Sequence, residues 1–180
     1  STDNTREVVS RYAKAQLLEV PRGIGRAIRE GLLAKKDNNY IIMDADGQHD
    51  PSDIPRFISL SHKYDVVLGV RPNKHFESIN RSFTSNFANR IALSMLGYNI
   101  NDATSGFRLL NRKARDLAIT IPYDDFFFQV ALINRAVKSG LRVGTVDINF
   151  GPRWNGKSKY NISFALRYLA SLIKEKQWHP

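Results

Sequence analysis

The chain contains the run Tyr40-Ile41-Ile42-Met43-Asp44-Ala45-Asp46, in which an apolar stretch stops abruptly at two acidic residues. A short continuous apolar run is typical of a strand that is buried on both faces in a parallel sheet. In open α/β sheets, ligands bind outside the carboxyl ends of the strands. The run therefore predicts a buried strand over 40–43 and a ligand site that begins at Asp44.

Helical and extended patterns alternate along the rest of the chain, which predicts the α/β class. Asn4 and Ser52 have the residue types that cap helices, and we expect them to begin the first and third helices. The expected helices cover 4–16, 24–36, 52–63, 79–95, 112–119, 126–138 and a segment from 162 onward, and the further strands cover 65–70, 107–110 and 141–150.

The composition is that of a folded protein with a basic surface. The 180 residues include 42% hydrophobic residues, and 27 Lys and Arg against 17 Asp and Glu give a net charge of +10. The absence of cysteine excludes disulfide scaffolds, thiolate metal sites and cysteine nucleophiles. No apolar run approaches the about 18 residues that a bilayer span needs. The positive charge indicates a polyanionic partner, which composition alone leaves open between nucleic acid, anionic lipid and phosphorylated small molecules.

The acidic pair predicts a metal site. In extended backbone, residues two apart point the same way, so the carboxylates of Asp44 and Asp46 can converge on one hard divalent cation, Mg²⁺ or Mn²⁺. The competing interpretation is that Asp46 or Asp50 only caps the following helix. His49 is interpreted as a hydrogen-bonded support rather than as a metal ligand.

The run from Ile41 to Pro51, Ile-Ile-Met-Asp-Ala-Asp-Gly-Gln-His-Asp-Pro, resembles the metal and donor motif of the inverting GT-A glycosyltransferases of family 2. Within them it is similar to the polyprenyl-phosphate sugar synthases related to dolichol-phosphate mannose synthase. The resemblance continues in order through residues 23–27, 67–71, 102–108 and 153–159.

This resemblance implies a Rossmann-like GT-A fold, with a mixed, mostly parallel sheet flanked by helices. We expect residues 1–160 to form a partial catalytic domain and residues 161–180 to form a C-terminal amphipathic helix. Residues 1–5 look like the tail of the family's Asp-Asp-Gly-Ser-Thr-Asp-x-Thr element, so the sheet is expected to lack its first strand through an N-terminal truncation.

For the donor, the resemblance implies that Asp44, Asp46 and Gln48 hold Mg²⁺ or Mn²⁺ and that Asp44, Asp46, Arg71 and Gly106 contact a nucleotide-sugar. Asp46 then also counts as catalytic, because the cation acts as a Lewis acid on the leaving nucleoside diphosphate.

For the acceptor, the resemblance implies that Arg81, Arg108, Arg153, Lys157 and Lys159 bind phosphate, as does Arg71 on the donor side. Asp102 matches an acid that serves as catalytic base or acceptor positioner. A phosphate acceptor is already anionic near neutral pH, so Asp102 would orient it; a sugar hydroxyl would need Asp102 as its base.

Three positions depart from the family pattern. Ala131 and Thr145 stand where relatives usually carry Glu, and Asp147 replaces a proline, which leaves the acceptor specificity open.

Together these observations predict a metal-dependent inverting hexosyltransferase that uses a donor of the GDP-mannose or UDP-glucose type and polyprenyl or dolichyl phosphate as acceptor. We expect it at an anionic membrane surface, on the cytoplasmic face, because the basic loop before the C-terminal helix would meet a lipid phosphate there. The alternatives are transfer to a saccharide hydroxyl in polysaccharide or cell-wall synthesis, and a non-catalytic basic module that binds polyanions. A nucleic-acid partner is not expected, because no aromatic-interleaved RNA motif is visible.

Overall fold

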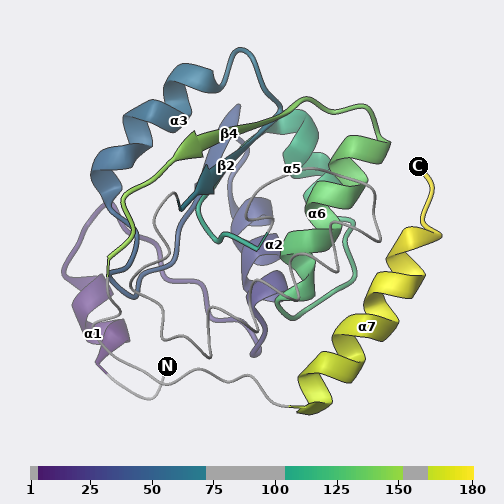
Figure 1. The fold of residues 1–180 in the computed structure, drawn as a ribbon. Coiled ribbons are helices and arrows are strands. Elements are labelled where there is room, and N and C mark those ends of the chain that lie inside the picture. The colour runs from purple at the N-terminus through teal and green to yellow at the C-terminus, as the bar shows by residue number, and fades with distance from the viewer. Residues whose placement is uncertain (1–3, 72–103, 152–161) are drawn as a thin grey trace.

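The computed structural model describes residues 4–71, 104–151 and 162–180 (Figure 1). The helix expected over 79–95 lies outside these ranges. The elements in chain order are α1 Thr5–Ser10, α2 Ile24–Ala34, β1 Asn39–Ile42, a 3₁₀ turn η1 Pro51–Asp53, α3 Ile54–Leu60, β2 Val66–Val70, β3 Arg108–Asn111, α5 Arg112–Ala118, α6 Phe127–Lys138, β4 Val143–Asp147 and α7 Ile162–Lys176.

The four described strands form one sheet in the order β1-β3-β2-β4. Strand β3 is antiparallel to both β1 and β2, and β2 is parallel to β4. Because β1 and β2 both run opposite to β3, the strands β1, β2 and β4 all end at the same edge of the sheet, and β3 begins there. The segments that follow three strands are thereby gathered at one place.

The predicted mixed α/β fold, with a sheet flanked by helices, is confirmed. The predicted environment of the 40–43 strand is wrong: β1 pairs antiparallel with β3 and its residues are half-buried or exposed. Among the described strands, two of the three ladders are antiparallel, because β3 lies between β1 and β2. The apolar run is explained by the pleat, which points Tyr40 and Ile42 to one core and Ile41 to the other.

Helices cover both faces of the sheet (Figure 1). On one face, Val66 and Leu110 pack in a core with residues of α2, α5 and α6. On the other face, Val67 and Leu109 pack against Phe57 of α3. Alternate strand residues therefore serve two cores, which fixes the sheet between two helical layers.

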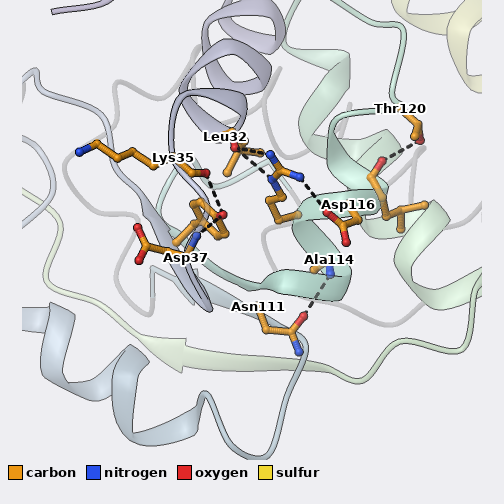
Figure 2. Close-up of polar contacts among 10 residues, drawn as sticks. Leu32, Lys35, Asp37, Asn111, Ala114, Asp116 and Thr120 are labelled. Carbon is orange, nitrogen blue, oxygen red and sulfur yellow. Dashed lines mark hydrogen bonds and ion pairs between the residues drawn. The ribbon is translucent and has the colours of Figure 1, made fainter. Parts of the chain in front are cut away.

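Side-chain hydrogen bonds define the helix ends on the first face (Figure 2). The Asn111 side chain accepts from the backbone N–H of Ala114 at 3.0 Å and caps α5. From the same helix, Arg115 Nε and Nη2 donate to the carbonyl of Leu32 at 3.0 and 2.9 Å. That carbonyl lies in the last turn of α2, where helix carbonyls lack helical partners, so Arg115 ties the two helices together.

Two expected helix starts differ in the structure. Asp50, rather than Ser52, caps the turn that leads into α3, because Pro51 takes the first helical position and the cap is the residue before it. Asn4 makes no side-chain cap, and α1 ends at Ser10 instead of near residue 16. Helix α1 buries no residue, and so short a helix without tertiary packing is marginal in water.

Helix α7 packs on α6 through a polar contact. The Glu175 carboxylate is 1% exposed and accepts from Arg135 Nε at 2.9 Å and from Asn134 Nδ2 at 3.2 Å. On the outer side of α7, Leu169 and Ile173 are 43% and 56% exposed. Of the helices within the described ranges, none is long and apolar enough to cross a bilayer.

Candidate active site

A cleft of about 750 Å³ lies at the edge where β1, β2 and β4 end. Its walls come from the segments that follow these three strands. The lining residues are Met43, Asp44, Ala45, Gly47, Gln48, His49, Asp50, Pro51, Arg71, Ile148, Asn149, Phe150 and Gly151. Of the residues proposed from the sequence, the structure brings Asp44, Gln48 and Arg71 together in this cleft.

The acidic loop, Asp44–Gln48, forms the first wall and is bent rather than extended. Gly47 has a φ of 80°, a left-handed conformation that favours glycine. Asp46 Oδ1 accepts from the backbone N–H of Gln48 at 3.1 Å, and Asp46 is not among the residues that line the cleft. The assumption of extended backbone through Asp46 is therefore wrong, and the two carboxylates do not share a strand face.

His49 supports the acidic loop through a hydrogen bond to its backbone. Its ring is buried between Phe107 and Phe150, with ring centroids 5.1 and 5.4 Å away. Its Nδ1 accepts from the backbone N–H of Asp44 at 3.3 Å. The interpretation of His49 as a hydrogen-bonded support is confirmed.

The segment Ile148–Gly151, called here the β4 wall, lines the cleft beside the acidic loop. Gln48 Nε2 donates to the Gly151 carbonyl at 3.1 Å, and the Gly151 N–H donates to the Gln48 carbonyl at 2.9 Å. Phe150 forms an antiparallel bridge with His49 and packs under the Arg71 guanidinium, whose carbon lies 4.9 Å from the ring centroid. The amide nitrogen of Gln48 is thus bound to protein, and its amide oxygen is the atom suited to a cation.

Gly106 lies against the acidic loop, although it is distant in sequence. A Cβ atom at this position would lie 2.6 Å from Asp44 Oδ2 and 3.2 Å from Oδ1. Any side chain at this position would displace the Asp44 carboxylate, whereas glycine leaves it in place. The role of Gly106 toward the donor stays a prediction; its role toward Asp44 is a finding.

Arg108 lies in the core. Its side chain is fully buried and donates to the carbonyls of Ser105 at 2.7 Å and Gln129 at 2.8 Å. This placement assigns Arg108 to the scaffold under the site, and we do not retain its predicted contact with phosphate. Among the departures from the family pattern, Ala131 is buried in α6 and Thr145 is exposed on β4.

Five proposed site residues lie outside the described ranges: Asp102, Arg81, Arg153, Lys157 and Lys159. Their roles stay predictions.

One residue near the site was missed by sequence reasoning. The Asp53 carboxylate is 1% exposed and accepts from the backbone N–H of Asn149 at 2.7 Å and from its side-chain Nδ2 at 3.0 Å. It also pairs with the Arg56 guanidinium. In the sequence Asp53 is an ordinary acid in a first helical turn, and no local signal points to a partner 96 residues away.

The residues of the acidic loop fit a hard divalent cation. Asp44, Asp46 and Gln48 offer two carboxylates and an amide oxygen, the ligands that Mg²⁺ and Mn²⁺ prefer over nitrogen or sulfur. Within the described ranges, the acidic loop included, no group of three or more His, Cys, Asp or Glu side chains is placed to hold a metal ion. A cation at this edge would be held by these oxygens and by substrate phosphates.

The family is decided by comparison with known proteins. The model for glycosyl transferase family 2 matches residues 1–117. The chain belongs to this family. Curated relatives include uncharacterized glycosyltransferases of Mycobacterium bovis and Mycobacterium tuberculosis, each 30% identical over 172 residues, which cover 93% of this chain and 76% of the relative.

Similar solved structures include glucosyl-3-phosphoglycerate synthase from M. tuberculosis with Mn²⁺, UDP-glucose and phosphoglyceric acid, at a TM-score of 0.70 and 16% identity. The same enzyme with phosphoglyceric acid gives a TM-score of 0.72 at 16% identity. The likeness covers 100% of this chain but only 66% and 67% of those chains, so this chain spans about two thirds of their length. At this identity the comparison shows a shared fold.

Proposed function

We propose that the chain forms the catalytic part of a metal-dependent, inverting glycosyltransferase, which moves a hexose from a nucleotide-diphosphate sugar to polyprenyl phosphate. The observation that carries the proposal is the convergence of Asp44, Gln48 and Arg71 on one cleft, in a chain of glycosyl transferase family 2. Oxygen ligands and a guanidinium in one cleft suit a metal-bound diphosphate.

Negative charge develops on the donor side when the bond between the sugar and the diphosphate breaks. A divalent cation on the acidic loop would supply Lewis-acid stabilisation of this charge. Arg71 is half-buried on the cleft wall, where its guanidinium can bind phosphate oxygens bidentately. His49 accepts from the backbone N–H of Asp44, and glycine at position 106 leaves room for the Asp44 carboxylate, so this side chain can meet the donor in its present place.

The acceptor side is proposed from charge. Arg153, Lys157 and Lys159 follow the last residue of the β4 wall in the sequence, and the chain carries a net charge of +10. A phosphate monoester has a second pKa of about 6, so it arrives ionised and needs no general base. In this proposal Asp102 orients the acceptor.

The outer face of α7 supports delivery of the acceptor from a membrane. The exposed aliphatic side chains of Leu169 and Ile173 are accompanied on the helix by exposed Arg167, Lys174 and Lys176. An apolar face with flanking cations is the pattern of a helix that lies on an anionic lipid surface. Location at the cytoplasmic face of a membrane is part of this proposal.

A small phosphorylated acid is the second candidate acceptor. Glucosyl-3-phosphoglycerate synthase, which shares the fold, was solved with phosphoglyceric acid. Both acceptors present an anionic phosphate, so only product analysis separates them.

The test is an acceptor panel. The protein is incubated with UDP-glucose or GDP-mannose, Mg²⁺ or Mn²⁺, and either polyprenyl phosphate, 3-phosphoglycerate or an oligosaccharide. We expect formation of a prenyl-phosphate hexose that depends on the metal. The rate of transfer should fall by about 100-fold in Asp44→Asn and in Asp46→Asn. The matched control is Asp116→Asn on the exposed side of α5, which should retain full activity.

The outcomes separate the parts of the proposal. A product on phosphoglycerate or on the oligosaccharide alone would refute the lipid acceptor and leave sugar transfer in place. The assigned site would be refuted if the rate of sugar transfer stayed the same after chelation of the metal and in both Asp44→Asn and Asp46→Asn. Salt-sensitive binding of polyanions without any sugar transfer would favour the non-catalytic alternative.

A further inference from the structure

A buried carboxylate lies behind the cleft, outside the residues that line it. Asp53 stands at the junction of η1 and α3, ten residues or fewer from the acidic loop in sequence. Its two oxygens accept three kinds of donor: the backbone N–H of Asn149, the Asn149 side-chain amide, and the Arg56 guanidinium. Such a carboxylate is costly to bury unless every oxygen is paired, so its partners are held firmly.

The partner of Asp53 belongs to the β4 wall. Asn149 lies between Ile148 and Phe150, and two residues later Gly151 exchanges hydrogen bonds with Gln48 of the acidic loop. The β4 wall is thus fastened at Asn149 by Asp53 and at Gly151 by Gln48. Phe150, which packs under Arg71, lies between these two attachments.

We propose that Asp53 is a positioning residue for the donor site. By fixing Asn149, it sets the place of Phe150 and Gly151, and through them the orientation of Arg71 and of the Gln48 amide. The inference rests on the proposed function, because its effect is the affinity of the cleft for a metal-bound nucleoside diphosphate. Asp53 contacts neither metal nor donor; it acts through Asn149.

A second buried carboxylate provides a matched control. Asp65 is 5% exposed and accepts from the backbone N–H of Arg142 at 2.7 Å and from Asn111 Nδ2 at 2.8 Å, with Arg142 Nε at 3.4 Å. Asp53 and Asp65 therefore have the same three kinds of partner: a backbone N–H, an asparagine amide and an arginine. Asp65 precedes β2 and lies at the opposite edge of the sheet from the cleft.

The experiment compares Asp53→Asn with Asp65→Asn in the full chain. In each variant the new amide keeps one acceptor oxygen but presents an NH₂ group where the carboxylate accepted hydrogen bonds. Binding of UDP, and separately of GDP, is titrated in the presence of Mn²⁺ at a temperature where circular dichroism shows both variants folded. We expect the dissociation constant of the nucleotide to rise about tenfold in Asp53→Asn, as it does when residues that hydrogen-bond to metal ligands are changed. In Asp65→Asn the dissociation constant should not change.

The readout separates positioning from general stability. Both variants should lower the melting temperature, and only Asp53→Asn should change nucleotide affinity. Equal affinities in wild type and Asp53→Asn, or an equal loss in both variants, would overturn the inference while the proposed function stands. A wild-type protein that binds neither nucleotide with Mn²⁺ would overturn the proposed function, and the inference with it.

Asn149→Ala gives an independent test if Asp53→Asn does not fold. This variant removes the side-chain bond at 3.0 Å and keeps the backbone bond at 2.7 Å. It should weaken nucleotide binding in the same direction by a smaller factor. Unchanged affinity in folded Asn149→Ala, when Asp53→Asn cannot be measured, would also overturn the inference.

Discussion

The contact between Gly106 and Asp44 gives a test of the donor side of the proposed site. In Gly106→Ala, the new methyl group would lie 2.6 Å from Asp44 Oδ2, 3.1 Å from Cγ and 3.2 Å from Oδ1. Gly106 does not have the left-handed φ that disfavours alanine, so the backbone accepts the substitution. The consequence is confined to the Asp44 carboxylate.

The size of the effect follows from this distance. To restore an ordinary contact, the carboxylate must retreat by about 0.8 Å. A misplacement of about 1 Å in an active site costs on the order of 100-fold in rate. We therefore expect kcat/KM to fall by about 10-fold to 100-fold, which corresponds to about 1.4 to 2.7 kcal/mol of lost transition-state stabilisation.

The assay is metal-dependent sugar transfer, measured with the melting temperature of each variant. Gly31→Ala is the control, because its methyl group would meet no atom within 4 Å and alanine stabilises a helix interior by about 0.5 to 1 kcal/mol. In an Asp44→Asn background, Gly106→Ala should lower kcat/KM little further, because both substitutions act on the side chain at position 44. Full activity in Gly106→Ala, or an additive loss in the double variant, would refute the reasoning.

Three further predictions concern stability. Arg135→Met should destabilise the protein by about 3 to 5 kcal/mol in urea unfolding, because it removes the cationic partner of the buried Glu175 carboxylate; a loss below about 1 kcal/mol would contradict this. Hydrogen bonds from Arg29 and Arg26 lower the pKa of Asp124 in the folded protein. The contribution of Asp124 to the free energy of unfolding should therefore be complete above its unfolded pKa of about 3.9 and should vanish as the pH falls through the lowered folded pKa. Asp124→Asn should flatten the acid limb of a plot of unfolding free energy against pH. Within the described ranges both amide atoms of buried Gln129 lack a hydrogen-bond partner, so Gln129→Met should raise the unfolding free energy by about 1 to 3 kcal/mol, and a decrease would contradict the assignment.

The sequence predicts those helices whose apolar spacing and ends lie within one stretch of the chain. Helix α6 was expected over 126–138 and covers Phe127–Lys138, because its apolar spacing and its ends lie within one stretch of chain. The pairing of β1 could not be predicted in this way. An apolar run looks the same beside a parallel and an antiparallel neighbour. The direction shows only in the ladder itself, which runs from Asn39 opposite Asn111 to Ile42 opposite Arg108.

The candidate site was predictable where it depends on a strand end and not where it depends on distant partners. Asp44 and Gln48 lie in the cleft because the strand before them stops at the sheet edge. The burial of Arg108 was not predicted, because the Gln129 carbonyl that accepts its hydrogen bond is 21 residues away in the sequence. Asp53 was overlooked for the same physical reason, since its partner Asn149 comes near only after the sheet has formed.

The parallel ladder between β2 and β4 has a consequence for synthesis on the ribosome. It joins Val66 to Val143, and contacts of such long sequence separation form slowly because a long loop must close first. The nascent chain can build α2 and α3 early, but the β4 wall, which ends at Gly151, emerges only after α5 and α6. The cleft is therefore completed only after Gly151 has left the exit tunnel.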